Sequence, residues 1–360
     1  MRKHYLDNIR WITVVLVVIY HVVFMFNGVT TELVVGPFHP FQPQDALQYL
    51  LYPWFMILLF VVAGASSRYA LQRQSPRSFL AARTRKLLVP STIGLVVFHW
   101  IGGYVNMQVT HAEALPPEIP GLIRHLILSV SGTNVLWFIQ MLWIYSVLLL
   151  LVHKWESGKL YERAKSCSIP VLLLLAVPLW LSAQVLNTPV IAVYRFGIYG
   201  TAFFLGYFIF AHESVIERLS KLWLPLSAGA LVMGIGYTIF YFGENYAAAP
   251  VVNSPFSIAY GWIVVLAAFA VMKKFGDRTS PFAGWMAQRS FGLYVLHYTP
   301  LSAAALWICK ENSLPAVLSY VITGAVAFLG SWLLYEIISR IPIVRWCVLG
   351  IRKKVRKDVL

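Results

Sequence analysis

The chain has 360 residues, of which 59% are hydrophobic and only 12% are charged. A soluble domain carries about twice that charged fraction, so the composition indicates an integral membrane protein. The formal net charge is +15, but the basic residues lie in short segments between apolar runs, which argues against nucleic-acid binding.

Ten apolar runs are long enough to cross a bilayer. The first follows Arg2 and Lys3 and could pass for a signal peptide, but no small-residue cleavage site comes after it, so we expect it to be retained. The sequence therefore predicts an all-α, polytopic transmembrane helix bundle of about ten spans. These spans cover about residues 11–27, 49–66, 87–108, 134–152, 168–186, 195–211, 224–242, 257–272, 290–308 and 315–338.

The Lys and Arg residues predict the orientation. With the N-terminus inside, all of them except Arg124, Arg195 and Lys310 fall in cytoplasmic segments. The opposite orientation would violate the positive-inside rule, so we expect both termini to be cytoplasmic and the protein to lie in the cell (plasma or inner) membrane. We expect one membrane domain over residues 1–340 and a basic juxtamembrane tail over 341–360, lying on anionic lipid.

Two predicted outer loops, 28–48 and 109–133, are long and carry titratable residues. Loops of this length often shape a binding surface, and the alternative is that they only cover the bundle. Their titratable residues are Glu32, His39 and Asp45 in the first loop, and His111, Glu113, Glu118, Arg124 and His125 in the second.

The first span places a cation and a histidine on one helix face. At about 100° per residue, His21 lies within roughly 20° of Arg10, and Asp7 lies about 60° away on the same side. At about 1.5 Å per residue, His21 is roughly 16 Å along the axis from Arg10, near the middle of a hydrocarbon layer about 30 Å thick. A titratable group there is costly and suggests function, here a general base. The alternatives are a boundary cation paired with Asp7 and a histidine satisfied by a neighbouring helix.

A basic cluster, Arg83, Arg85 and Lys86, stands at the cytoplasmic mouth of the third span. Positive-inside topology alone would place cations here. The functional interpretation is phosphate binding, because a cofactor with several phosphates needs fixed cations and Arg offers a planar fork for them.

The ninth and tenth spans hold further polar residues. His297 lies about 12 Å in from Arg289, on the same face as Ser290, and is either a second catalytic or orienting group or a packing histidine bonded to a carbonyl. Glu336, four residues before Arg340, is explained by an i,i+4 pair at the interface. We consider Ser290, Tyr294, His297 and Glu336 a possible second polar site.

Other motifs are missing from the sequence. It contains no Gly-x-Ser-x-Gly elbow, Walker loop or His-Glu-x-x-His motif. The three cysteines, Cys167, Cys309 and Cys347, form no Cys-x-x-Cys pair, so we expect no disulfide framework and no metal site. Gly197, Gly200 and Gly206 are better explained by close helix packing.

The ordered set of motifs resembles the type 3 acyltransferases, integral membrane proteins that move acyl groups onto carbohydrates and related acceptors. Arg10, ten residues and then His21 fit the family's Arg-x10-His motif. Two departures stand out: Ala63-Gly64-Ala65 lies where the family has Ser-Gly-Tyr, and Lys86 replaces the second arginine of Arg-x-x-Arg. The other matching segments are Tyr5-Leu6-Asp7-Asn8-Ile9-Arg10, Pro53-Trp54-Phe55-Met56, Leu136-Trp137-Phe138-Ile139, Phe203-Phe204-Leu205-Gly206-Tyr207 and Ser290-Phe291-Gly292-Leu293-Tyr294-Val295-Leu296-His297.

The resemblance implies a cytoplasmic acyl-CoA donor, acetyl- or succinyl-CoA, and no metal. Its phosphates would lie on Arg83, Arg85 and Lys86, with Arg10 near the pyrophosphate, while His21 deprotonates an acceptor hydroxyl from the outer side. A covalent acyl-histidine is the less favoured variant. Tyr294, Ser290 and His297 are candidate oxyanion donors. The sequence shows no fused extracytoplasmic SGNH-type domain, so the membrane domain or a separate partner would complete transfer.

The acceptor class is open among a surface glucan, peptidoglycan, a teichoic acid sugar, a secreted polysaccharide, a macrolide-like metabolite and a lipid. A different function would use the same buried ionisable residues: transport of a small polar solute or a lipid-linked sugar. A purely structural or receptor role would leave the charged face of the first span unexplained.

Overall fold

The computed structural model describes residues 3–30, 33–110, 115–116, 118–156, 158–188 and 193–352. These residues form helices and their connections and no β-strand, with one isolated bridge between Asn187 and Arg195. The predicted all-α class is confirmed. The predicted loop residues Glu32, His111 and Glu113 lie outside the described residues.

Seven helical segments among the described residues are long and apolar enough to cross a membrane, and a bent pair, Pro281–Leu296 with Tyr298–Lys310, would make an eighth. Two predicted spans, 168–186 and 195–211, form the shorter apolar helices Ile169–Ala183 and Phe196–Phe210. All ten predicted runs are therefore helical and mark a multi-pass membrane protein, while ten crossings and their orientation stay predictions. The seven segments are His4–Phe24, Pro43–Leu71, Pro76–Val109, Asn134–Trp155, Trp223–Tyr241, Pro255–Phe275 and Ala316–Arg340.

The chain divides into two compact units, and each is discontinuous in sequence. The first unit contains Met1–Thr13, Ala46–Leu80 and Ile144–Ala287. The helices wholly within it are α2 (Ala46–Leu51), α3 (Phe55–Leu71), α9 (Lys159–Ala164), α10 (Ile169–Leu174), α11 (Ala176–Ala183), α12 (Phe196–Leu205), η5 (Gly206–Phe210), α13 (Glu213–Lys221), α14 (Trp223–Tyr241), α15 (Ala249–Val252) and α16 (Pro255–Phe275).

The second unit contains Val14–Asp45, Ala81–Trp143 and Gln288–Leu360. Four helices contribute residues to both units: α1 (His4–Phe24), α4 (Pro76–Arg83), α8 (Trp137–Trp155) and α17 (Pro281–Leu296). The helices wholly within the second unit are η1 (Pro43–Asp45), η2 (Thr84–Leu88), α5 (Val89–Gly94), η3 (Leu95–His99), α6 (Trp100–Val109), α7 (Gly121–Ser131), η4 (Asn134–Leu136), α18 (Tyr298–Ala303), η6 (Ala304–Lys310), α19 (Ala316–Arg340) and α20 (Pro342–Leu349).

Glycines allow the closest helix contact in the first unit, where α3 packs against α12 and η5. A Cβ atom at Gly64 would lie 1.9 Å from the carbonyl oxygen of Phe203, and one at Gly206 would lie 2.0 Å from that of Val61. A Cβ at Gly197 would likewise lie 2.0 Å from the Ser182 carbonyl oxygen. Small residues let helix backbones approach closely in a membrane, so the predicted packing role of Gly197 and Gly206 is confirmed.

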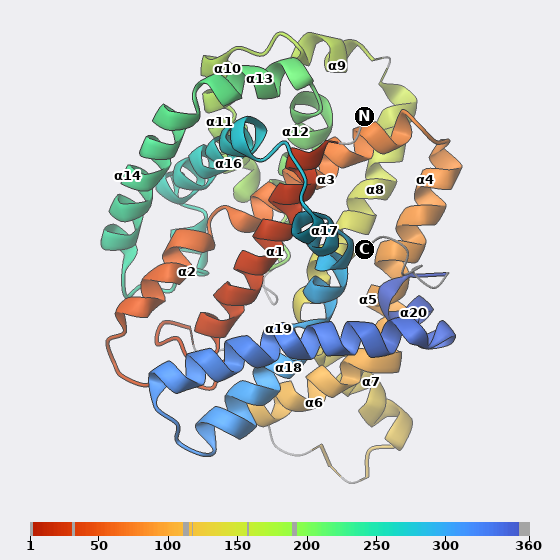
Figure 1. Cartoon of the computed structure of the whole chain (residues 1–360), viewed down its shortest axis with the longest axis vertical. Helices are drawn as coiled ribbons and strands as arrows, with labels where there is room; N and C mark the ends of the chain where they lie inside the picture. The colour runs from red at the N-terminus through yellow and green to blue at the C-terminus, as the bar shows by residue number, and fades with distance from the viewer. Residues whose placement is uncertain are drawn as a thin grey trace. The chain divides into compact units, whose positions relative to one another are not determined.

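The predicted ninth span is bent: α17 and the run Tyr298–Lys310, which begins with α18, meet at 52°. Both helices are labelled in Figure 1. His297 lies at the break, and Pro300 follows three residues later. A proline has no N–H to donate to the carbonyl four residues earlier, here that of Leu296, and its ring crowds the preceding turn. The proline therefore explains why the predicted ninth span bends beside its histidine.

Candidate functional site

Two histidines of the second unit meet where α17 ends. The Nε2 atom of His297 lies 3.3 Å from the Nδ1 atom of His21, and the two ring centroids are 5.1 Å apart. His297 is fully buried. His297 is therefore the residue from another predicted span that lies against His21.

The hydrogen bonds around the pair assign its protons. The Nδ1 atom of His21 lies 2.8 Å from the carbonyl oxygen of Val17, which can only accept, so Nδ1 carries the hydrogen. The Nδ1 atom of His297 donates in the same way to the carbonyl of Tyr294, 2.8 Å away. With both rings neutral, His297 Nε2 is an acceptor for His21 Nδ1–H, and the lone pair of His21 is on Nε2. That is the atom a general base needs.

Aromatic residues surround this histidine pair. The ring of Tyr298 stands edge-on to His21, with centroids 5.3 Å apart, and Tyr20 makes a similar contact at 5.1 Å. The hydroxyl of Tyr294 donates to the carbonyl of Val135 at 2.6 Å, which fastens α17 to η4. Tyr294 therefore anchors α17, the helix that ends directly before His297. Ser290, four residues before Tyr294 on the same helix, is buried.

Arg10 bonds to two side chains of the first unit. Its guanidinium donates to Asp7 at 3.2 Å, the predicted pair one turn earlier, and to the hydroxyl of Ser66 at 2.9 Å. Ser66 directly follows Ala63-Gly64-Ala65, and the sequence analysis missed it as a contact of Arg10. Because α1 is one uninterrupted helix, the predicted spacing between Arg10 and His21 is kept.

The basic cluster lies at a π-helical turn, η2, that follows α4. The indole of Trp143 donates to the hydroxyl of Thr84 at 3.0 Å and fixes the turn to α8. The ammonium of Lys86 lies 3.9 Å above the ring of Phe291 and donates to the carbonyl of Leu349 at 3.3 Å. Of the three predicted phosphate ligands, Lys86 already has two partners within the protein, the Leu349 carbonyl and the Phe291 ring.

Glu336 has the predicted interfacial partner and a second one. Its carboxylate lies 3.9 Å from the guanidinium of Arg340, at i,i+4, and 3.5 Å from that of Arg289 in α17. The i,i+4 interpretation of Glu336 is confirmed as geometry, and the pair with Arg289 adds a link between α19 and α17. These two ion pairs explain the position of Glu336 without a catalytic role.

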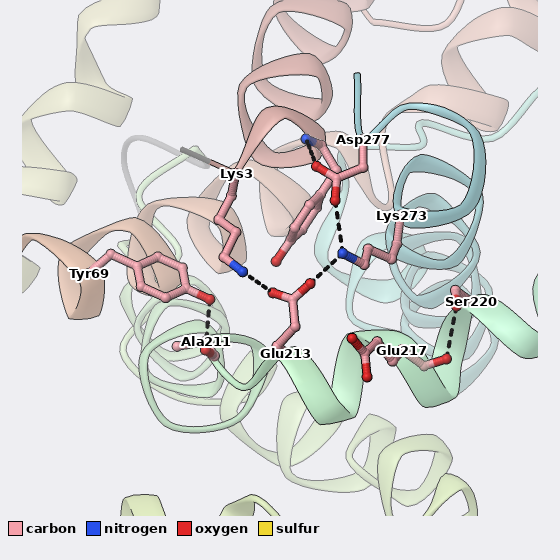
Figure 2. Close-up of polar contacts among 9 residues, drawn as sticks. Lys3, Tyr69, Ala211, Glu213, Glu217, Ser220, Lys273 and Asp277 are labelled. Carbon is pink, nitrogen blue, oxygen red and sulfur yellow. Dashed lines mark hydrogen bonds and ion pairs between the residues drawn. The ribbon is translucent and has the colours of Figure 1, made fainter. Parts of the chain in front are cut away.

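The first unit contains an ionic cluster that the sequence analysis did not anticipate. Glu213, at the start of α13, accepts from Lys3 at 2.5 Å and from Lys273 of α16, and Lys273 also pairs with Asp277 at 2.8 Å. Figure 2 shows Glu213 between the two lysines. The backbone N–H of Tyr5 donates to Asp277 at 3.2 Å. The cluster thus fastens the start of α1 to α13 and to the end of α16.

The carboxylates of this cluster are stabilised in their charged form. Burial alone would raise the pKa of Glu213, but its bonds with Lys273 and Lys3 outweigh burial and hold the pKa below its usual range. Burial would also raise the pKa of Asp277, but the bonds from Lys273 and from the Tyr5 N–H outweigh burial and hold this pKa below its usual range. Every charge here has a partner, as expected of a structural cluster.

Of the predicted residues, the structure brings His21 and His297 together and joins Arg10 to Asp7. A family model described as an acyltransferase domain matches residues 3–336, nearly the whole chain. No curated protein and no solved structure matches the chain significantly. The resemblance drawn from the ordered motifs is thereby confirmed, and the chain belongs to the acyltransferase type 3 family, as a membrane acyltransferase.

Proposed function

We propose that the protein moves an acyl group, acetyl or succinyl, from cytoplasmic acyl-CoA to a hydroxyl of an extracytoplasmic carbohydrate or related acceptor. Family membership supports acyl transfer in general. The single observation that carries the catalytic assignment is the histidine pair, which leaves the lone pair of His21 on Nε2.

In this mechanism His21 is the general base. Its Nε2 accepts the proton of the acceptor hydroxyl while the oxygen attacks the thioester carbonyl carbon. The tetrahedral intermediate collapses, the carbon–sulfur bond breaks, and the CoA thiolate takes the proton back from the imidazolium. The Nδ1–H of His21 is shared between the carbonyl of Val17, at 2.8 Å, and Nε2 of His297, at 3.3 Å, and these two acceptors hold the ring while the proton moves at Nε2.

The donor's phosphates are assigned to the two arginines of the basic cluster. Arg83 and Arg85 offer planar forks suited to phosphate oxygens. Arg10 lies on the same helix as His21, roughly 16 Å toward its N-terminus, and is assigned to the pyrophosphate end of the donor. Asp7 and Ser66 would then orient the Arg10 guanidinium, since both bond to it.

His21→Ala tests the catalytic assignment, with labelled acetyl-CoA and purified protein in proteoliposomes. We expect transfer and donor hydrolysis to fall by at least about a hundredfold, the low end of what a general base contributes. His99→Gln is the matched control, because His99 is also buried in the second unit, but its ring contact is with Phe98 and it is not among the bonds and ring contacts found for the pair in the described residues. Undiminished transfer by correctly inserted His21→Ala protein would refute the assignment.

The acceptor is identified by mass spectrometry of surface glycans from cells with and without the protein. We expect loss of an ester mass from one glycan class in its absence, and recovery with wild type but not with His21→Ala. Solute flux that needs no acyl donor, with no ester lost, would instead favour the transport function.

A further inference from the structure

The last described helix, α20, lies beyond residue 336, where the family match ends, and inside the predicted juxtamembrane tail. It packs against α5, η3 and α19 of the second unit (Figure 1). Its Cys347, Val348 and Leu349 are buried. A tail that only lies on lipid would not bury three consecutive residues within the protein, so α20 is a packed part of the second unit.

The end of α20 touches the basic cluster backbone to backbone. Gly350 closes the helix with a left-handed φ of 63°, the usual glycine position one residue past a helix end. A Cβ there would lie 2.2 Å from the carbonyl oxygen of Arg85 and 2.9 Å from the Cα of Lys86. One turn back, the Cys347 carbonyl oxygen would lie 2.8 Å from a Cβ at Gly94 of α5. Two glycines thus let α20 rest directly on η2 and α5.

Lys86 closes the contact from the other side. Its ammonium donates to the carbonyl of Leu349, one of the last carbonyls of α20, at 3.3 Å. Those carbonyls have no partner within the helix and carry the negative end of its dipole, so a cation there is stabilising. The ring of Phe291, 3.9 Å below, attracts the same charge. Lys86 is therefore a helix-capping cation in this structure.

We propose that α20 is a clasp on the donor-binding turn, and that Lys86 is a positioning residue that holds this clasp while Arg83 and Arg85 bind the donor's phosphates. The proposal rests on the proposed acyl-CoA donor. It explains why a lysine is sufficient where the family motif has an arginine, since a single point charge caps a carbonyl and no planar fork is required. Losing the clasp should weaken donor binding and leave the chemical step at His21 in place.

Gly350→Ala tests the clasp without any donor, by hydrogen exchange of the amides of Thr84–Leu88 and Val89–Gly94. The added Cβ must push the clasp off the Arg85 carbonyl, so we expect exchange there to rise by about tenfold or more. Gly36→Ala is the matched control, because Gly36 also has a positive φ, 102°, but a Cβ there meets nothing within 4 Å. Unchanged exchange in Gly350→Ala would overturn the clasp.

Lys86→Met and Lys86→Arg test the positioning role, through the KM for acetyl-CoA and the kcat. Loss of a hydrogen bond from a charged group corresponds to about tenfold or more in affinity, so we expect Lys86→Met to raise KM by about that factor with kcat nearly unchanged, and Lys86→Arg to restore it. In the double variant with Gly350→Ala the two effects should not add, since both break one contact.

A direct phosphate ligand would behave differently. Lys86→Met would then raise KM without faster exchange in Pro342–Leu349, and its effect would add to that of Gly350→Ala. That result would overturn the positioning role. If wild type itself transfers nothing from acetyl- or succinyl-CoA, the proposed donor fails, while the hydrogen-exchange test of the clasp still stands.

Discussion

The histidine pair and the ionic cluster differ in the partners that their polar side chains have: ring nitrogens and carbonyls in the pair, and oppositely charged groups in the cluster. In the second unit, the hydrogen bonds of His21 and His297 within the described part of the chain run to ring nitrogens and carbonyls, and to no carboxylate or cation. In the first unit, Glu213 and Asp277 are matched with Lys3 and Lys273. The cluster stabilises charges that already exist, whereas under the proposed mechanism the pair holds a neutral base that becomes charged during the reaction.

The difference separates activity from stability. A charged carboxylate with bound cations is a poor proton acceptor, so the cluster can fasten helices but has little capacity for acid–base work. A neutral imidazole with one nitrogen fixed and the other available is suited to proton transfer, and a neutral pair contributes less to holding helices together. Substitutions in the two regions should therefore change different measurements.

The largest expected effect is on activity at the histidine pair. His297→Ala removes the second of the two acceptors beside His21 Nδ1–H, so we expect kcat per folded molecule to fall by about a hundredfold. The cavity left at this buried position should also lower the melting temperature, so the rate is measured on the folded fraction. His297→Gln should recover part of the rate, because its amide oxygen can accept the same hydrogen. Single-turnover transfer from labelled acetyl-CoA measures both. Equal rates for wild type and His297→Ala would place the orienting group elsewhere.

The next effect is on stability at the ionic cluster. Glu213→Gln removes the charge that two lysines bind, and we expect the free energy of unfolding to fall by about 1–2 kcal/mol, with the rate per folded molecule unchanged. Glu217→Gln, one turn along the same helix, is the matched control, because Glu217 is exposed and the ion pairs found for Lys3 and Lys273 among the described residues do not include it. Denaturation in detergent measures the difference. Equal losses in the two variants would contradict the structural role of the cluster.

The pH dependence of stability sharpens the same contrast. Because the folded pKa values of Glu213 and Asp277 are lowered, their stabilisation is fully present above the unfolded values of about 4 and is lost as pH falls through the folded values. We expect melting temperatures of wild type to drop more steeply below about pH 4 than those of a Glu213→Gln, Asp277→Asn double variant. Parallel curves would show that other groups cause the acid sensitivity.

The smallest effect is expected at Glu336. Arg340 is 65% exposed and 3.9 Å away, so Arg340→Ala should change the free energy of unfolding by no more than about 0.5 kcal/mol. Arg289→Ala, which removes the 27% exposed partner, should cost slightly more. Denaturation of both variants measures the order. A loss of activity at intact stability in either variant would show that this site takes part in catalysis.

Helical periodicity predicted what lies along one helix and not what lies across from it. The shared helix of Arg10 and His21 and the Asp7–Arg10 pair follow from spacing alone. Contact between His21 and His297 joins residues that are 276 positions apart, and a helical wheel cannot tell which residue of another span faces it. The bend was foreseeable at Pro300, since proline breaks the helix ladder.

Lys86 is a second residue whose partner on another helix could not be predicted from the local sequence. Its place among basic residues predicted phosphate binding, and nothing local to it indicated the Leu349 carbonyl. The signal was in the tail, where Pro342 and Gly350 bracket eight residues in the way that helix-starting prolines and helix-ending glycines do. Its basic composition instead predicted a juxtamembrane tail lying on anionic lipid. Likewise, the i,i+4 spacing of Lys273 and Asp277 was visible, but Lys3 and Glu213 join them only in the folded chain.

The π-helical turn η3 also bears on how relatives of this chain can differ in length. A π-turn accommodates one residue more than an α-turn, so it absorbs an insertion without rotating the helix beyond it. Removing one residue from Leu95–His99 would convert the turn to α-helix and leave α6 facing as before. Removing one from the middle of α19 would instead rotate every later residue by about 100°. Natural length variation within this family is therefore expected to gather at such turns.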